Sequence, residues 1–178
     1  MVTITYFVHG TTTDNENDIA TGCLPGELSE LGVQQAKELG ELVADQQFDV
    51  VFCSDLKRSV ESAELGFGST HQLIQDKQLR ECDYGDLNGA PDTFKDRMKD
   101  YIDVPFPGGE SYKDVETRIA SFVDYLRQEW DGKHVAIVCH QAPQLALDVI
   151  AKGRTWEQAI DEDWRKSKAW QPGWIYEV

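Results

Sequence analysis

Short apolar runs alternate with longer amphipathic segments along this chain. Residues 3–8 (TITYFV), 49–53 (DVVFC) and 134–139 (HVAIVC) are rich in β-branched and aromatic residues. Runs of this length that are apolar almost throughout are typical of strands buried on both faces. Residues 71–74 could add a further strand, and the tail over residues 164–178 is expected to end in an edge strand.

The segments between these runs carry helical spacing. Helices are predicted over residues 29–44, 56–65, 94–101, 111–129 and 144–151. The first begins at Ser29 as N-cap, and the last opens near Pro143. The residues expected to face inward are Leu31, Ala36, Leu39, Leu42 and Val43 in the first helix, and Val115, Ile119, Phe122, Val123 and Leu126 in the fourth.

Alternation of strands and helices predicts an α/β fold, a three-layer α/β/α sandwich with a mostly parallel central sheet. No repeat, linker or low-complexity stretch divides the 178 residues. We therefore expect one domain over residues 1–178. Polar or glycine-containing loops are expected over residues 11–27 and 79–89.

Composition narrows the classes of partner. The chain has 32 acidic and 17 basic residues, a net charge of −15, so nucleic acid and anionic membranes should be repelled. No apolar run approaches the roughly 20 residues that span a bilayer. Residues 1–6 have neither a basic stretch nor a long apolar core, so no signal peptide is expected. The four cysteines have no framework spacing, and reduced thiols in the cytoplasm are therefore expected. No pair of ligands has zinc-like spacing, so neither a metal nor a cofactor is expected. The sequence gives no indication of oligomeric state.

Residues able to do chemistry follow the predicted strands. His9 and Gly10 come after the first strand, Arg58 lies just beyond the second, and His140 follows the strand at 134–139. Sites in open α/β sheets gather at the carboxyl ends of strands. A neutral imidazole is a nucleophile toward phosphorus, and a guanidinium binds phosphate oxygens bidentately. Taken singly, each of these residues also fits a purely structural role.

Glu81 lies in the turn-rich segment LRECDYGDLNG. Cleavage of a phosphate ester needs a proton for the leaving alkoxide, and a carboxyl group beside the cleft can supply it. The chain has 32 acidic residues, so a single glutamate carries little weight without its neighbours.

Six segments in order resemble the histidine phosphatase superfamily, which has the phosphoglycerate mutase-like fold. They are YFVHGTTTDN, LSELGVQQAKELG, CSDLKRSVESA, LRECDYGDLNG, FPGGESYKDVETRI and VAIVCHQAPQLAL, and together they extend over most of the chain. The resemblance implies that His9 is phosphorylated and then hydrolysed, and that Arg58 and His140 hold the phosphoryl oxygens. It implies that Glu81 protonates the leaving group and later activates water. Residues at matching or adjacent positions, expected to bind phosphate or substrate, are Gly10, Thr12 and Gln141.

Two departures from the family pattern stand out. Members usually have arginine before the His-Gly pair, where this chain has Val8; either the arginine is replaced or one residue is deleted. Losing one such donor costs on the order of 10²–10³ in rate. Cations that could take its place are Lys57, Arg80, Arg118, Arg165, Lys166 and Lys168. The second departure is Gln141-Ala142, where members commonly have glycine.

The resemblance favours a phosphatase acting on a small phosphate monoester. Phosphoglycerate mutase-type phosphoryl transfer is the alternative, but mutases of this family usually carry an insertion where only about two dozen residues separate Glu81 from Gly108. A catalytically weak or inactive member that binds a phosphate ligand is the third possibility. Specificity is expected from residues 11–27, residues 88–103 and the tail. The tryptophans towards the end of the chain could form an apolar lid or close the core, and most are expected in the core: Trp156, Trp164, Trp170 and Trp174.

Overall fold

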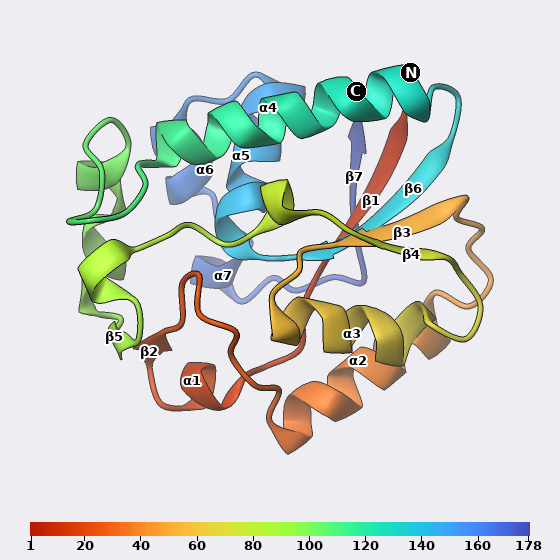
Figure 1. Cartoon of the computed structure of the whole chain (residues 1–178), viewed down its shortest axis with the longest axis horizontal. Coiled ribbons are helices and arrows are strands. Elements are labelled where there is room, and N and C mark those ends of the chain that lie inside the picture. Colours follow the sequence, from red (N-terminus) through yellow and green to blue (C-terminus); the bar gives the residue numbers. More distant parts are fainter.

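The computed structural model describes all residues 1–178 and is built on a central sheet of five strands in the order β4-β3-β6-β1-β7 (Figure 1). The strands are β1 (Thr3–Val8), β3 (Val50–Cys53), β4 (Leu73–Gln75), β6 (His134–Cys139) and β7 (Trp174–Glu177). All neighbours are parallel except β7, which runs antiparallel to β1 at the edge. The predicted edge strand in the tail is therefore confirmed.

Helices cover both faces of the sheet (Figure 1). On one face α2 (Glu30–Leu42) packs against α3 (Lys57–Phe67). On the other lie α4 (Tyr112–Glu129), α5 (Gln141–Lys152) and α6 (Trp156–Asp161). This is the α/β architecture with a mostly parallel sheet that the sequence predicted.

Short elements fill the connections. They are α1 (Thr13–Glu16), β2 (Ile19–Ala20), the 3₁₀ turns η1 (Lys77–Leu79), η2 (Gly85–Leu87) and η3 (Thr93–Tyr101), β5 (Ala90–Pro91) and α7 (Trp164–Ser167). β2 pairs with β5 in a separate two-stranded sheet. The segment expected as a loop over residues 11–27 thus contains α1 and β2. The short helix expected over residues 94–101 is a 3₁₀ helix.

The register of β1 places the end of this strand beside the end of β6. Val8 pairs with Cys139, and the His9 amide donates to the Cys139 carbonyl at 3.0 Å. Side chains alternate between the two apolar layers: Tyr6 packs toward α4 and α5, and Phe7 toward α2 and α3. Both faces are apolar because both are covered.

Serine caps fix the starts of two predicted helices. The Ser29 side chain accepts from the Gly32 amide at the start of α2, and Ser111 forms a capping box with Asp114 at the start of α4. The helix predicted to open near Pro143 begins earlier, with His140 as N-cap. Pro143 falls in the first turn of α5, where its missing N–H costs no intrahelical hydrogen bond.

Two expectations about packing are wrong. Leu31 and Leu42 of α2 are 51% and 63% exposed, although Ala36, Leu39 and Val43 are buried as predicted. The buried face of α2 is therefore narrower than the apolar pattern of its sequence suggests. Leu42 lines a cleft that is described below. Of the four tryptophans considered for the core, only Trp156 of α6 is buried there; Trp164, Trp170 and Trp174 line that same cleft.

The four cysteine thiols are free. None of the helices combines the length and the apolar character needed to cross a bilayer.

Candidate active site

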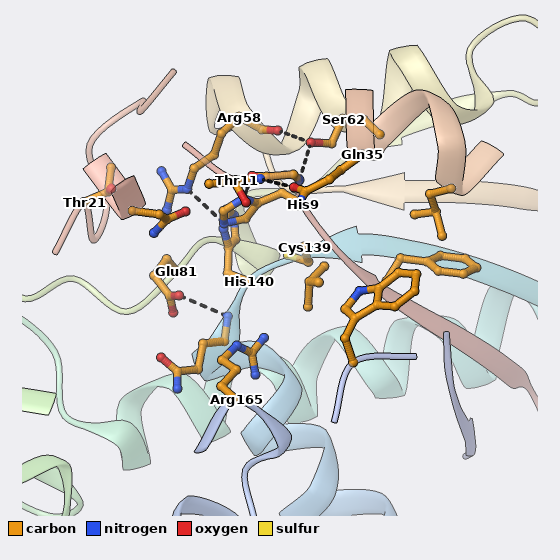
Figure 2. Close-up of a pocket in the computed structure, with 18 of the residues that line it drawn as sticks. His9, Thr11, Thr21, Gln35, Arg58, Ser62, Glu81, Cys139, His140 and Arg165 are labelled. Carbon is orange, nitrogen blue, oxygen red and sulfur yellow. Dashed lines mark hydrogen bonds between the residues drawn. The ribbon is translucent and has the colours of Figure 1, made fainter. Parts of the chain in front are cut away.

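A cleft of about 620 Å³ lies at the carboxyl ends of β1 and β6. Six of the seven predicted site residues line it: His9, Gly10, Arg58, Glu81, His140 and Gln141. They come from segments far apart in the sequence and converge because parallel strands end at the same edge of the sheet. Figure 2 shows Arg58 above His9 and His140, with Glu81 to one side and Arg165 below.

His9 follows β1 directly, and its ring is fixed by its neighbour. The Nδ1 atom lies 2.7 Å from the Gly10 carbonyl oxygen. A carbonyl only accepts hydrogen bonds, so Nδ1 carries the proton and Nε2 keeps its lone pair. Burial, and then the positive charge of Arg58, lower the pKa of His9 from 6.5 to about 3. The imidazole is therefore neutral at neutral pH and presents a nucleophilic nitrogen.

Arg58 lies in the first turn of α3 with its guanidinium buried. Its Nη1 atom donates to the carbonyl oxygens of Leu24 at 2.6 Å and Pro25 at 3.1 Å. Its Nη2 atom donates to Gly22 at 2.8 Å. The Nε atom donates to Nε2 of His9 at 3.4 Å (Figure 2). An arginine has five N–H donors, so only one of them, on Nη2, has no protein acceptor.

His140 lies beside His9, with the two ring centroids 5.1 Å apart. Its main chain is held by Tyr6, whose hydroxyl donates to the His140 carbonyl at 2.7 Å and accepts from the His140 amide at 3.0 Å. The Nε2 atom lies 2.6 Å from Oγ of Ser54, whereas the buried Nδ1 atom has no hydrogen-bond partner. Burial, and then the charge of Arg58, hold the pKa of His140 well below its usual value.

Glu81 is held against the start of α5. Its Oε1 atom accepts from the amides of Cys82 and Ala142, both at 2.9 Å. Its Oε2 atom accepts from the amide of Gln141 at 3.0 Å. The positive end of the α5 dipole adds to these contacts. These contacts fix the Glu81 carboxyl group against the backbone of Gln141 and Ala142, which directly follow His140, at the edge of the cleft.

Gln141 and Gly10 complete the predicted set within the cleft. The Gln141 side chain donates from Nε2 to Asp163 at 2.5 Å, so its amide is tied to the tail. The Gly10 amide donates to Oγ of Ser62 at 3.0 Å. A Cβ atom on Gly10 would lie 2.3 Å from the carbonyl oxygen of Gly32, so only glycine fits this backbone approach.

Thr12, the seventh predicted residue, is not brought to the cleft. It is buried, and its hydroxyl accepts from the Asn15 amide at 3.0 Å as the N-cap of α1. The expectation that Thr12 binds phosphate or substrate is wrong in this structure, because its side chain closes a capping box with Asn15. Its neighbour Thr11 and Asn15 line the cleft instead.

The position before His9 carries no cation. Val8 ends β1 in unbroken register, packs against the core and lines the cleft. Arg165 is the one residue among the candidate substitutes that lines the cleft. The others, which do not, are Lys57, Arg80, Arg118, Lys166 and Lys168.

Arg165 is oriented by three contacts. Its Nη1 atom donates to Oδ1 of Asp163 at 3.0 Å and its Nη2 atom to Oε1 of Gln144 at 3.1 Å. Its guanidinium lies 4.5 Å from the centre of the Trp164 ring. Arg165 also lowers the pKa of both His9 and His140, although less than burial and Arg58 do.

Sequence reasoning missed several residues that line the cleft. Thr21 follows β2 and Lys95 lies in η3, within the two segments expected to set specificity, but no pattern singled out either side chain. Tyr84 was signalled in part, since it lies in the same turn-rich segment as Glu81. No group of three or more His, Cys, Asp or Glu side chains has an arrangement that could hold a metal ion.

Comparisons with known proteins identify the family and the fold. Residues 6–173 match the family model of the histidine phosphatase superfamily (branch 1). The chain is 33% identical over 165 residues to the 2,3-bisphosphoglycerate-dependent phosphoglycerate mutase of Methylorubrum extorquens (strain PA1), covering 83% of this chain and 77% of the relative. It is 32% identical over 140 residues to the uncharacterized phosphatase PhoE of Bacillus subtilis (strain 168), covering 78% and 72%. Among solved structures, the mycobacterial glucosyl-3-phosphoglycerate phosphatase complexed with VO3 superposes with a TM-score of 0.79 at 28% identity, covering 89% of this chain and 86% of that one.

Proposed function

Because this chain belongs to the histidine phosphatase superfamily, we propose that it hydrolyses a phosphate monoester through a phosphohistidine formed on Nε2 of His9. The observation that carries the proposal is the state of the His9 ring. Its Nδ1–H donates to the Gly10 carbonyl at 2.7 Å, and its pKa is lowered to about 3. A neutral imidazole oriented in this way is ready to attack phosphorus without first losing a proton.

In the first step Nε2 of His9 forms a bond to phosphorus while the ester P–O bond breaks. The departing alkoxide takes a proton from the carboxyl group of Glu81, which is held beside His140 by backbone amides. In the second step Glu81 accepts a proton from water, whose oxygen attacks phosphorus. The N–P bond then breaks, and phosphate leaves with His9 restored.

The phosphoryl oxygens need donors on more than one side. Arg58 offers the single N–H on Nη2 that no carbonyl occupies, next to His9. His140 offers Nδ1, which has no partner in the protein. When the Ser54 hydroxyl donates to Nε2 of His140, the proton of the neutral ring lies on Nδ1 and points to the phosphoryl site.

Arg165 supplies the second positive charge in this proposal. A phosphate monoester carries close to two negative charges at neutral pH, and most of the donors of Arg58 are already engaged. Arg165 is fixed by Asp163 and Gln144 on the side of the cleft opposite Arg58 (Figure 2). We assign it the phosphate-binding role that Val8 cannot fill.

The experiment is hydrolysis of p-nitrophenyl phosphate by the native protein and by a His9→Ala variant, with folding of the variant checked by circular dichroism. We expect release of nitrophenol by the native protein only, a phosphorylated His9 in rapidly quenched samples kept above acid pH, and inhibition by vanadate. Release at equal rates by both proteins would rule out the role of His9. Binding of phosphate without any turnover would favour the phosphate-binding member over the enzyme.

Phosphoglycerate mutase activity is the second candidate, favoured by the 33% identity to a 2,3-bisphosphoglycerate-dependent mutase. It predicts interconversion of 2- and 3-phosphoglycerate after priming with 2,3-bisphosphoglycerate. Hydrolysis of p-nitrophenyl phosphate with no interconversion would leave the phosphatase proposal alone.

A further inference from the structure

The cleft continues well past His9, between α2 and the C-terminal tail. This arm of the cleft is lined by apolar side chains from both elements: Leu39 and Leu42 of α2, and Trp164, Trp170 and Trp174 of the tail. The whole cleft measures about 620 Å³, a size that accommodates an organic molecule with many more atoms than a phosphate group. The apolar arm therefore has room for the alcohol portion of a phosphate ester.

The aromatic wall of the arm is held in place. The rings of Trp164 and Trp174 are stacked, with centroids 4.9 Å apart and planes inclined by 25°. The indole N–H of Trp164 donates to Oε1 of Gln144 at 3.1 Å, which ties the tail to α5. Because these side chains are already ordered, a ligand that contacts them loses little further side-chain entropy.

Two apolar side chains of the arm remain exposed to water. Leu42 is 63% exposed and Trp170 is 51% exposed, although both line the cleft. Covering apolar surface of this kind contributes roughly 25 cal/mol per Å². A flat apolar group bound between α2 and the tail would cover both.

The charge of the arm selects against anions. Glu38 of α2 lines it and adds a negative charge. The cations that line the cleft are committed elsewhere: Arg58 and Arg165 face the phosphoryl site, and Lys95 pairs with Asp92 at 2.5 Å. A carboxylate or a second phosphate on the alcohol portion would therefore meet Glu38 without a free cation nearby.

We propose that this arm is a leaving-group subsite for an uncharged, flat and apolar alcohol, so that the preferred substrates are aryl phosphates rather than phosphorylated sugar acids. The inference rests on the proposed hydrolysis at His9 and names the substrate class of that same site. Phosphorus lies at His9, and the aromatic part of the ester lies between Leu42 and Trp170.

The test compares 1-naphthyl phosphate with glycerol 2-phosphate as substrates. Trp170→Ala and Leu42→Gln should each lower kcat/KM for 1-naphthyl phosphate by about tenfold, with little change for glycerol 2-phosphate. Leu31→Gln is the matched control, because Leu31 is another exposed leucine of α2, at 51%, that does not line the cleft. Glu38→Gln should raise kcat/KM for 3-phosphoglycerate several-fold and leave 1-naphthyl phosphate unaffected.

Binding of 1-naphthylmethylphosphonate, measured by calorimetry, separates this inference from the proposed function. The phosphonate cannot be hydrolysed, so weaker binding to Trp170→Ala than to Leu31→Gln supports the subsite even if the native protein turns over no ester. Equal effects of the cleft variants on both esters, or equal phosphonate affinity in all variants, would overturn the subsite while leaving hydrolysis at His9 intact.

Discussion

The hydroxyl oxygen of Ser54 lies 2.6 Å from Nε2 of His140, which links the end of β3 to the end of β6. Ser54 does not line the cleft, so it acts as a positioning residue for the His140 ring. Ser54→Ala should lower vanadate affinity and kcat/KM by about tenfold, the scale of one lost orienting hydrogen bond. The diagnostic measurement is the tautomeric state of the His140 ring, read from ¹⁵N NMR chemical shifts. Without the Ser54 hydroxyl the ring should be a mixture of the two neutral tautomers. An unchanged tautomer together with unchanged vanadate affinity would remove Ser54 from this role.

Arg165→Ala should weaken phosphate binding and lower kcat/KM on the order of 10²-fold, because the proposed phosphoryl site loses the second of its two arginines. The matched control is Lys166→Ala, a neighbouring cation that does not line the cleft and pairs with Asp161 at 3.8 Å. Steady-state kinetics and phosphate inhibition measure both. Arg165→Lys keeps the positive charge but loses the planar guanidinium, whose two terminal nitrogens donate separately to Asp163 and Gln144. It should therefore recover only part of the activity. Equal kinetics for Arg165→Ala and Lys166→Ala would exclude Arg165 from phosphate binding.

His9 should show no titration near the usual histidine pKa. Its pKa is about 3, because burial and the charge of Arg58 disfavour the imidazolium form. As the pH falls from about 8 to about 4, kcat/KM should not decline through protonation of His9. NMR titration of the His9 ring in the unliganded protein measures this directly. A His9 resonance that shifts with a midpoint near 6.5 would contradict the structure.

The same shift makes stability depend on pH. The pKa of His9 is about 6.5 in the unfolded chain and about 3 in the folded one. Below about pH 6.5 the unfolded state binds a proton that the folded state does not, so the free energy of unfolding falls as the pH decreases. Urea unfolding between about pH 5.5 and pH 7 should show this decline, with a smaller slope for His9→Gln. Identical slopes would show that the folded protein does not hold the His9 ring neutral.

Gly10→Ala should destabilise the fold by about 2 kcal/mol or more, because the new Cβ atom would lie 2.3 Å from the backbone oxygen of Gly32. Gly132→Ala is the comparison. Gly132 has a φ of +73° but open space around its Cβ position, so it should lose only about 1 kcal/mol. Thermal unfolding of the two variants measures the difference. A stability loss for Gly10→Ala no larger than for Gly132→Ala would show that the backbones of Gly10 and Gly32 can move apart to accommodate a methyl group.

Much of the sheet was predictable because its central strands are apolar on both faces. The β-branched run ending at Val8 and the run ending at Cys139 indicated parallel neighbours, and His9 and His140 therefore met at one edge. The N-cap at Ser29 was predictable from the sequence as well, because a serine before an amphipathic segment can accept a hydrogen bond from a free amide in the first turn of the helix.

Other features depend on contacts that no local pattern encodes. The sequence places Arg58 near phosphate but does not reveal that carbonyls of the Gly22–Pro25 loop occupy most of its donors. The exposure of Leu42 follows from the cleft beneath the tail, and the position of that tail depends on the pairing of β7 with β1. Thr12 fits a phosphate-binding pattern and a helix cap equally well, and only the conformation around Asn15 distinguishes them.

The pairing of β1 also governs how the molecule must be assembled during translation. Thr3 pairs with His134 on one side and with Glu177 on the other, and β1 has no other partner in the sheet. A nascent chain that ends before β6 holds His9 on a strand without hydrogen-bonded neighbours. Pairing over such sequence separations is slow, and until it occurs the unpaired apolar strand β1 is prone to aggregation. His9 is synthesised well before β6, yet it gains its position beside His140 only when β6 has followed.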